Sequence, residues 1–331
     1  RIFPPDCSGY AQSPGRGGGH YRYLGRKGRV GGSAGFVYLC VTMMAVIPTE
    51  SVQEQCVQAL ALQLAGLRSP EINTLLGTLP APDELPLELP SGLALYEQEL
   101  QRYGKEAEAI LGRCAELGIG VYPSSSASYP RAVRRRLGAH CPPLLYTLGA
   151  HELLGEPRRV AVIGTRMPDG EGLAHVRRVT RELVGRGAII LSGLARGCDA
   201  EAHRTCLEIG GRGIAVVATG LDETYPREHT ALQRVLLRQG GLVLSEYPPG
   251  SPMGRWQFVV RDRLLATLAT EVLVAQCGLE SGTLHTVRFA QRYGVPCFAQ
   301  QYETYSEVSG GNQWLLREGL AQPHQLLLSP S

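Results

Sequence analysis

Residues 160–166 read VAVIGTR and residues 188–199 read AIILSGLARGCD, so each apolar run ends in a turn that carries glycine and arginine. After the first turn, apolar residues recur at helical spacing, at Leu173, Val176, Val179 and Leu183. The pattern predicts strand, turn and helix, with the helix over 171–185. A second helix is predicted to begin near Asp199, a favoured N-cap residue, and to run to about Ile209.

The same alternation continues downstream. Short apolar runs are expected to be strands near 158–163, 188–191, 212–218, 241–245, 271–275 and 295–299. Helical patterns separate most of them. We therefore predict an α/β fold over residues 156–331: a Rossmann-like, doubly wound, mostly parallel sheet with right-handed crossovers.

The turns that follow the strands are expected to bind anions. In a parallel sheet these turns share one edge, where glycines let backbone N–H groups face a crevice and helix N-termini add partial positive charge. Arg166 and Arg196 would add forked donors suited to phosphate oxygens. The alternatives are a structural salt bridge for each arginine, and tight turns or close helix packing for Gly164 and Gly193.

Two segments precede the predicted sheet domain. Apolar residues fall on one face of two helical stretches, 51–67 and 92–117, so residues 45–117 are predicted to form a small helical domain of the SAM-like type. Residues 118–155 are interpreted as a connecting module between this domain and the sheet.

Residues 1–44 are glycine-rich and basic, and we expect a disordered tail there. Natural translation from Met43 or Met44 would place most of this segment upstream of the protein. The tail has six basic residues against Asp6, a net +5, whereas the whole chain has +3, so residues 45–331 carry −2. Binding to a polyanion must therefore come from local clusters of arginine.

The nine cysteines include no C-x-x-C pair and suggest neither a zinc site nor a disulfide framework, so we expect a reducing cytoplasm. The longest apolar segment, near 36–47, is shorter than the roughly 20 residues that span a bilayer, and no membrane association is expected.

Several motifs along residues 118–321 point to a known family. They are VAVIGTR at 160–166, SGLARGCDAEAH at 192–203, GLD at 220–222 with Tyr225-Pro226, SEYPPG at 245–250, the segment 258–263, ESGT at 280–283, and Gly311-Asn312 with Glu318-Gly319. With these motifs the chain resembles the DNA-processing protein A family, also called Smf. The resemblance implies a non-enzymatic, cofactor-free protein that binds single-stranded DNA, forms a homodimer and helps to load the RecA recombinase in natural transformation.

The resemblance also implies, position by position, which residues bind DNA and phosphate. They are Gly164, Thr165, Arg166, Ser192, Gly193, Arg196, Gly197, Gly220, Arg227, Phe258, Arg261, Arg263, Ser281 and Gly282. Arg166 would contact a phosphate, Ser192 and Arg196 would line the same pocket, and Arg261 and Arg263 would extend a positive track. Phe258 could support a base, because stacking on a ring contributes about 1–3 kcal/mol and tolerates any base. Sequence-independent binding is expected.

Some of these positions have a second interpretation. Phe258 and Trp256 could be core residues, and Arg227 and Arg263 could be solvated surface charges. Asp262 stands where the family typically has asparagine, and it would either weaken DNA binding or orient a neighbouring arginine.

The sequence leaves two enzymatic alternatives. A nucleotide-cleaving hydrolase of the lysine-decarboxylase-like group is suggested by ESGT at 280–283, but its Pro-Gly-Gly lead-in is absent. A dinucleotide-dependent oxidoreductase would need G-x-G-x-x-G after the first strand, and Gly164 does not begin one. Asp199 and His203, four residues apart, are interpreted as a helix cap and its neighbour and not as a catalytic pair.

Overall fold

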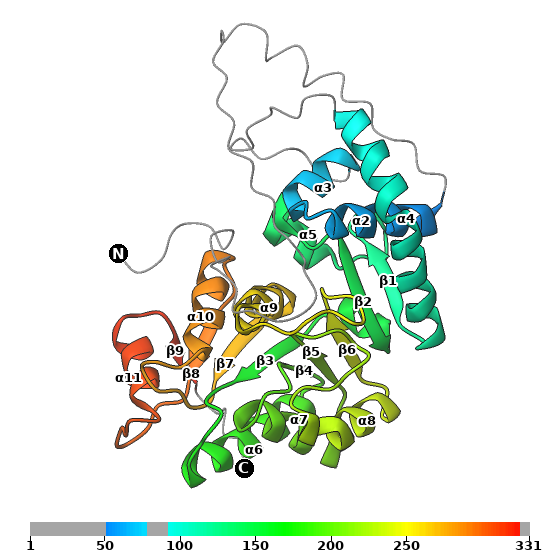
Figure 1. Ribbon diagram of the computed structural model, residues 1–331. Coiled ribbons are helices and arrows are strands. Elements are labelled where there is room, and N and C mark those ends of the chain that lie inside the picture. The colour runs from blue at the N-terminus through cyan, green and yellow to red at the C-terminus, as the bar shows by residue number, and fades with distance from the viewer. Residues whose placement is uncertain (1–50, 78–91, 325–331) are drawn as a thin grey trace, which may run out of the picture.

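A computed structural model describes residues 51–77 and 92–324, which contain a nine-stranded sheet with the order β1-β2-β6-β5-β4-β3-β7-β8-β9 (Figure 1). The strands are β1 (Gly120–Pro123), β2 (Leu144–Gly149), β3 (Arg159–Ile163), β4 (Ile189–Ser192), β5 (Gly213–Val216), β6 (Leu242–Ser245), β7 (Glu271–Val274), β8 (Cys297–Ala299) and β9 (Gln322–Pro323). Neighbours from β6 to β9 are parallel, whereas β1 and β2 pair antiparallel. The predicted Rossmann-like, mostly parallel sheet is confirmed.

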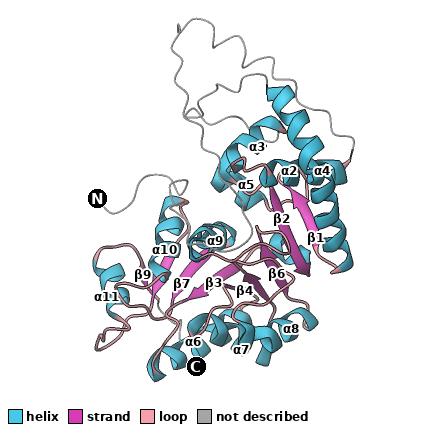
Figure 2. Ribbon diagram, in the orientation of Figure 1, coloured by secondary structure: helices cyan, strands magenta, loops and turns pink. Residues whose placement is uncertain are grey.

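Helices cover both faces of this sheet (Figure 2). One face carries α6 (Gly170–Gly185), α7 (Cys198–Glu208) and α8 (Thr230–Arg238), and the other carries α9 (Arg255–Leu268) and α10 (Thr283–Arg292), with α11 (Gly310–Arg317) beside β8. Alternate residues of β3 serve the two layers: Val160 and Val162 pack with Val176 of α6, whereas Ala161 and Ile163 belong to the core under α9. Burial on both faces explains the uninterrupted apolar run.

The strand order places a crevice next to β3. The connection through α6 leads from β3 to β4 on one side, whereas α9 leads to β7 on the other side. Val160 accordingly pairs with Ile190 of β4 and with Glu271 of β7. Ligands of open α/β sheets bind where connections diverge in this way, outside the carboxyl ends of the strands.

The remaining helices pack at the antiparallel end of the sheet. They are α2 (Val52–Leu64), α3 (Ser69–Leu75), α4 (Gly92–Glu116) and α5 (Arg131–Leu137). The Ser51 hydroxyl caps α2 by accepting from the Glu54 N–H at 3.2 Å. Leu60 of α2 shares a core with Tyr146 of β2, so residues 118–155, interpreted as a connecting module, also contribute two strands to the sheet.

The structure differs from the predicted helices in two places. The short helix α3 was not predicted, and α2 ends three residues before the expected Leu67. The tail over 1–44 lies outside the described residues. Among the helices described between residues 51 and 324, none has the length and apolar character required to cross a bilayer.

Candidate nucleic-acid interface

A cleft of ≈ 1170 Å³ opens beyond the carboxyl ends of β3 and β7, at the place that the topology indicates. Its walls come from the turns after β3 and β4, from α9, from the loops before α10 and α11, and from Tyr225 in the loop after β5. Its lining includes Gly164, Thr165, Arg166, Tyr225, Arg255, Phe258, Arg261, Asp262, Ser281 and Gly282. Seven of the residues predicted from the sequence therefore share one cleft.

The turn after β3 is held rigidly by its neighbours. The Thr165 N–H donates to the Gln276 carbonyl at 2.7 Å, and the Thr165 carbonyl accepts from the Cys198 N–H at 3.1 Å. A Cβ at Gly164 would lie 2.8 Å from the Gln276 carbonyl oxygen, so this close approach requires glycine. These contacts fix the backbone position from which the Arg166 side chain extends.

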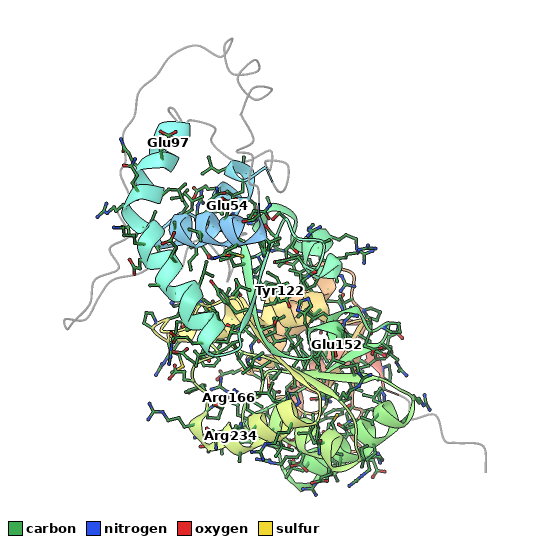
Figure 3. All side chains as sticks on the ribbon, turned by 90° about the vertical axis from the view of Figure 1, so that its right-hand side faces the viewer. Glu54, Glu97, Tyr122, Glu152, Arg166 and Arg234 are labelled. Atoms are coloured by element: carbon green, nitrogen blue, oxygen red, sulfur yellow. The ribbon has the colours of Figure 1, made fainter. Side chains whose placement is uncertain are left out.

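Arg166 and two aromatic rings form a stack at the rim of the cleft. The guanidinium carbon of Arg166 lies 5.5 Å from the centre of the Phe258 ring, which lies 5.3 Å from the ring of Tyr225. Arg166 is exposed (labelled in Figure 3), and no carboxylate within residues 51–77 and 92–324 is in ion-pair distance of it. A cation over a ring is attractive and leaves the guanidinium edge free to donate.

The turn after β4 is used differently. The Asp199 carboxylate accepts from the N–H groups of Gly193 and Ala195 at 3.1 and 3.4 Å, so these amides do not face the cleft as open anion donors. The Ser192 hydroxyl is buried and donates to the Val162 carbonyl at 2.8 Å. The prediction that Ser192 and Gly193 line the phosphate pocket is wrong, because both groups are already committed inside the protein.

The predicted cap of α7 also needs correction. The helix begins at Cys198, and its N-cap is Gly197, at φ +71°, and not Asp199. A Cβ at Gly197 would lie 2.7 Å from the Arg166 backbone, so this glycine lets the two turns pack together. Asp199 lies in the first turn of the helix and holds the preceding loop.

Arg196 lies outside the cleft lining and is paired. Its Nε and Nη2 atoms donate to the two carboxylate oxygens of Glu228, each at 2.7 Å. These hydrogen bonds lower the pKa of the Glu228 carboxyl. Of the two interpretations of Arg196, a salt bridge is therefore the arrangement observed, although both side chains remain exposed.

Arg261 forms part of the cleft floor. The residue is only 6% exposed, and its Nη1 atom donates to the Val216 carbonyl at 3.0 Å. Its guanidinium occupies the space that a side chain at Gly193 would need, which explains glycine there. Asp262 pairs with it, Oδ1 to Nε, at 3.3 Å. This contact is the one that the orienting role of Asp262 requires.

The Asp262 carboxyl is itself perturbed. Burial raises its pKa, Arg261 opposes that shift, Asp199 adds to it and Arg166 again opposes it, with a result of about 7. Asp199 is also buried, and burial raises its pKa while Arg261 and the loop amides oppose the rise. The cleft floor is therefore a mixed network of acids and one arginine.

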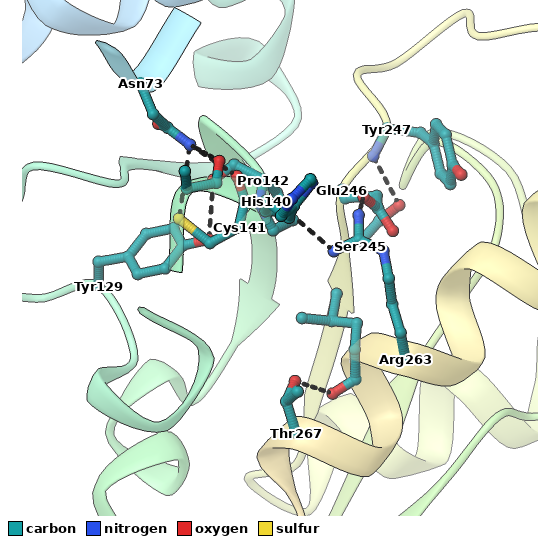
Figure 4. Close-up of polar contacts among 12 residues, drawn as sticks. Asn73, Tyr129, His140, Cys141, Pro142, Ser245, Glu246, Tyr247, Arg263 and Thr267 are labelled. Atoms are coloured by element: carbon teal, nitrogen blue, oxygen red, sulfur yellow. Dashed lines mark hydrogen bonds and ion pairs between the residues drawn. The ribbon is translucent and has the colours of Figure 1, made fainter. Parts of the chain in front are cut away.

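Arg263 does not extend a positive track along the cleft. Its side chain is 13% exposed, forms an ion pair with Glu246 at 2.5 Å, and donates to the His140 carbonyl at 3.2 Å. Figure 4 shows Arg263 of α9 beside Glu246, which follows β6, and near His140 in the loop that precedes β2. The prediction for Arg263 is wrong, because its partner Glu246 holds it inside the protein.

The other predicted residues lie at different distances from the cleft. Gly220 is buried against the Pro248 carbonyl and is not part of the lining. Arg227 is exposed two residues after Tyr225, also outside the lining. Ser281 and Gly282 form the far wall, where the Ser281 hydroxyl accepts from the Thr283 N–H at 3.2 Å.

Sequence reasoning missed several residues of the lining. Arg255 adds a cation and Tyr225 an aromatic ring, whereas Glu280 and Glu307 add carboxylates. The cleft lining therefore has three arginines, Arg166, Arg255 and Arg261, and four carboxyl groups, those of Asp199, Asp262, Glu280 and Glu307, so it has no excess of positive charge. Within the described residues, no three His, Cys, Asp or Glu side chains are grouped as a metal site.

Comparison with known proteins gives a consistent result. A family model described as DNA recombination-mediator protein A matches residues 121–327. The DNA processing protein DprA of Bacillus subtilis is 31% identical over 227 residues, which cover 68% of this chain and 75% of that protein. The Smf protein of Synechocystis is 41% identical over 194 residues, 57% of this chain and 48% of its own length. The chain thus spans about half of the Synechocystis relative.

Two solved structures are similar as well. The DNA processing protein A of Helicobacter pylori, whose structure concerns its single-stranded DNA binding mode, has a TM-score of 0.54 at 33% identity and covers 62% of this chain and 90% of its own. The DprA protein of Streptococcus pneumoniae has a TM-score of 0.62 at 26% identity, and the match covers 86% of this chain and 92% of that protein's chain.

Proposed function

Because this chain belongs to the DNA recombination-mediator protein A family, as its motifs predicted, we propose that it binds single-stranded DNA in the cleft beside β3, without sequence preference and without catalysis. Support from the relatives is direct in one case, since the Helicobacter protein is described by its single-stranded DNA binding mode. The geometry of the cleft supplies an independent reason.

The observation that carries the proposal is the stack of Arg166, Phe258 and Tyr225. An unpaired base can lie against an aromatic ring, while a guanidinium donates to the adjoining phosphate. The guanidinium carbon of Arg166 lies 5.5 Å from the centre of the Phe258 ring, and the turn after β3 holds the Arg166 backbone in place. Arg166 and Phe258 both line the same cleft. Every base has a π-face, so this arrangement gives affinity without reading sequence.

Duplex DNA fits the same stack poorly. In a duplex the bases are stacked on each other and their faces are not available to Phe258 or Tyr225. Only the phosphate contacts of Arg166 and Arg255 would remain for a double strand. We therefore expect a preference for single strands that arises from the rings and not from the charges.

Fluorescence anisotropy with labelled single-stranded and double-stranded oligonucleotides over a salt series tests the proposal. We expect tighter binding of the single strand, equal affinity for unrelated sequences, and a slope of log K against log salt of roughly −1.4, about −0.7 for each of the two phosphates that Arg166 and Arg255 contact. Equal or tighter binding of the duplex would contradict the proposal, as would affinity that does not change with salt.

The proposal includes delivery of the RecA recombinase to bound DNA and a homodimer as the active form, both of which the family resemblance implies. Light scattering at several protein concentrations tests the dimer, and a monomer at micromolar concentration would contradict it. A strand-exchange assay with DNA that is already coated by a single-strand-binding protein tests RecA delivery. No acceleration by the protein would contradict that part.

A further inference from the structure

Trp256 occupies an unusual position on the first turn of α9. Its side chain is 51% exposed and lies outside the lining of the cleft, although its neighbour Arg255 is part of that lining. An indole is the largest apolar side chain, and its open half contributes nothing to the core of this protein. Single exposed apolar residues are common, so exposure alone assigns no role to Trp256.

The surrounding residues hold this indole in place. The Tyr247 ring lies 6.0 Å from it at an angle of 79°, an edge-to-face contact that supports one side. A Cβ at Gly254 would lie 2.7 Å from the indole Nε1, so the ring rests directly on a backbone without a side chain. The backbone of Tyr247 is held by a hydrogen bond in which its N–H donates to the Ser245 hydroxyl at 3.0 Å (Figure 4). The indole of Trp256 is therefore packed against Tyr247 and Gly254, and the rest of the ring is exposed to solvent.

The charge beside this ring is positive. Arg255 is the one charged residue in the sequence from Tyr247 to Gln257, and it is exposed. Phe258 of α9 and Arg166 of the turn after β3 form the first combination of a ring and a guanidinium. Trp256 and Arg255 place a second ring and a second guanidinium next to each other in the sequence of the first turn of α9. A ring beside a cation matches the alternation of base and phosphate in a nucleic acid strand.

Arg255 lies between Phe258 and Trp256 around the axis of α9. On a helix, Trp256 is 100° around the axis from Arg255, whereas Phe258 and Asp262 lie on the other side of Arg255 and face the cleft. A strand that leaves the cleft past Arg255 reaches Trp256 by turning around the first turn of α9.

We propose that Trp256, supported by Tyr247, is a second base-stacking platform for the same single strand, reached by oligonucleotides longer than those that fill the cleft. This inference rests on the proposed function. The occupant is an unpaired nucleic acid base, and Arg255 contacts the phosphate between the two platforms.

Intrinsic fluorescence tests the platform directly, because the chain has only two tryptophans. In a W314F variant, Trp256 is the remaining indole, and Trp314 lies on α11, away from the cleft lining. We expect poly-dT of about 20 nucleotides to quench this fluorescence, whereas a trimer that fits within the cleft leaves it unchanged. Absence of quenching by the longer strand, under conditions where anisotropy shows binding, would overturn the inference.

Affinity measurements supply the second test. Replacement of Trp256 by alanine should weaken binding of the 20-mer by at least about fivefold and leave the trimer unaffected, whereas W256F should retain most of the affinity. The matched control is M253A, which removes an exposed apolar side chain without a ring. Equal losses for W256A and M253A would overturn the platform, as would a W256A loss that W256F does not rescue.

The outcomes separate this inference from the proposed function. If wild-type protein binds no single-stranded DNA, the proposed function fails. If binding depends on Arg166 but not on Trp256, the function stands and the platform fails. If W256A instead lowers the mass of the protein in light scattering and leaves DNA affinity unchanged, the surface joins copies of this chain and the platform is likewise overturned.

Discussion

Two turns of similar composition lie against each other at the edge of the sheet, and they differ in how their polar groups are used. The turn after β3 leaves Arg166 exposed over the Phe258 ring. The turn after β4 has its amides bound by Asp199 and its arginine bound by Glu228. A turn that contains glycine and arginine therefore predicts a backbone shape, but the acids around it decide whether its donors are available to a ligand.

The largest effect that we expect from this difference is on the free energy of unfolding. Replacement of Gly193 by alanine puts a Cβ into the Arg261 guanidinium and separates this arginine from Asp199. We expect the free energy of unfolding to fall by about 3 kcal/mol, measured by urea denaturation. Gly170, which has open space around it at the start of α6, is the control, and G170A should not destabilise the protein. Equal stability of G193A and wild type would contradict the packing role of the second turn.

This contrast shows what the sequence could and could not predict. The apolar runs were sufficient for the central strands, because strands buried on both faces need only apolar residues, as Val160 and Ile190 illustrate. The helix α6 followed from its apolar spacing. The use of β2 as an antiparallel neighbour of β6 was not foreseen, because no local pattern specifies a partner so far along the chain.

The candidate site was predictable to a similar extent. Gly164, Arg166 and Phe258 were found because a motif brings each of them to the edge of the sheet. A salt bridge was one interpretation of Arg196, but its partner Glu228, 32 residues away, was not identified, and the pairing of Arg263 with Glu246, 17 residues away, was missed. These partners meet only through tertiary packing. An arginine in a motif gives no indication of which acid the fold places beside it.

The next largest effect should be on DNA affinity. R166A should weaken single-strand binding by about tenfold or more for every sequence, because it removes hydrogen bonds between charged groups worth about 1.5–3 kcal/mol. R196A should change affinity by less than about twofold, since Glu228 already occupies its donors. Anisotropy measures both variants. R181A, an exposed arginine late in α6 and near the opposite edge of the sheet, is the control for loss of charge. A larger loss for R196A than for R166A would reverse the comparison.

A smaller effect should follow pH, through Asp262. Its folded pKa is raised to about 7 from 3.8, mainly by burial, so the carboxyl is largely neutral at pH 6 and ionised at pH 8. Ionisation places negative charge in the floor of the cleft, and DNA affinity should fall by about fivefold between these pH values. The variant D262N should show a flatter pH profile, whereas an unchanged profile would contradict this role.

The same carboxyl has a consequence for stability. The folded state holds this proton more tightly than the unfolded chain does, so its stabilising contribution is complete below pH ~4 and is lost as pH rises through about 7. Thermal unfolding of wild type and D262N at pH 6 and pH 8 checks this sign. A wild-type protein that gains stability from Asp262 ionisation over this interval would contradict it.

The smallest expected effect comes from freeing the second arginine. In E228Q, Arg196 loses its carboxylate partner while both side chains stay exposed. We expect single-strand affinity to rise by about twofold, because an exposed ion pair no longer competes with phosphate. Anisotropy measurements compare E228Q with the double variant R196A/E228Q. Both variants lack the negative charge of Glu228, but only E228Q has a free Arg196, so the double variant should not show the twofold gain in affinity.

The salt dependence of DNA binding, compared among wild type, R166A and R196A, tests the central claim most directly. Each phosphate contact contributes about −0.7 to the slope of log K against log salt for a single strand. The slope should become shallower by about 0.7 in R166A and remain that of wild type in R196A. Equal slopes for wild type and R166A, or a shallower slope in R196A alone, would show that the open arginine of the first turn is not the phosphate contact.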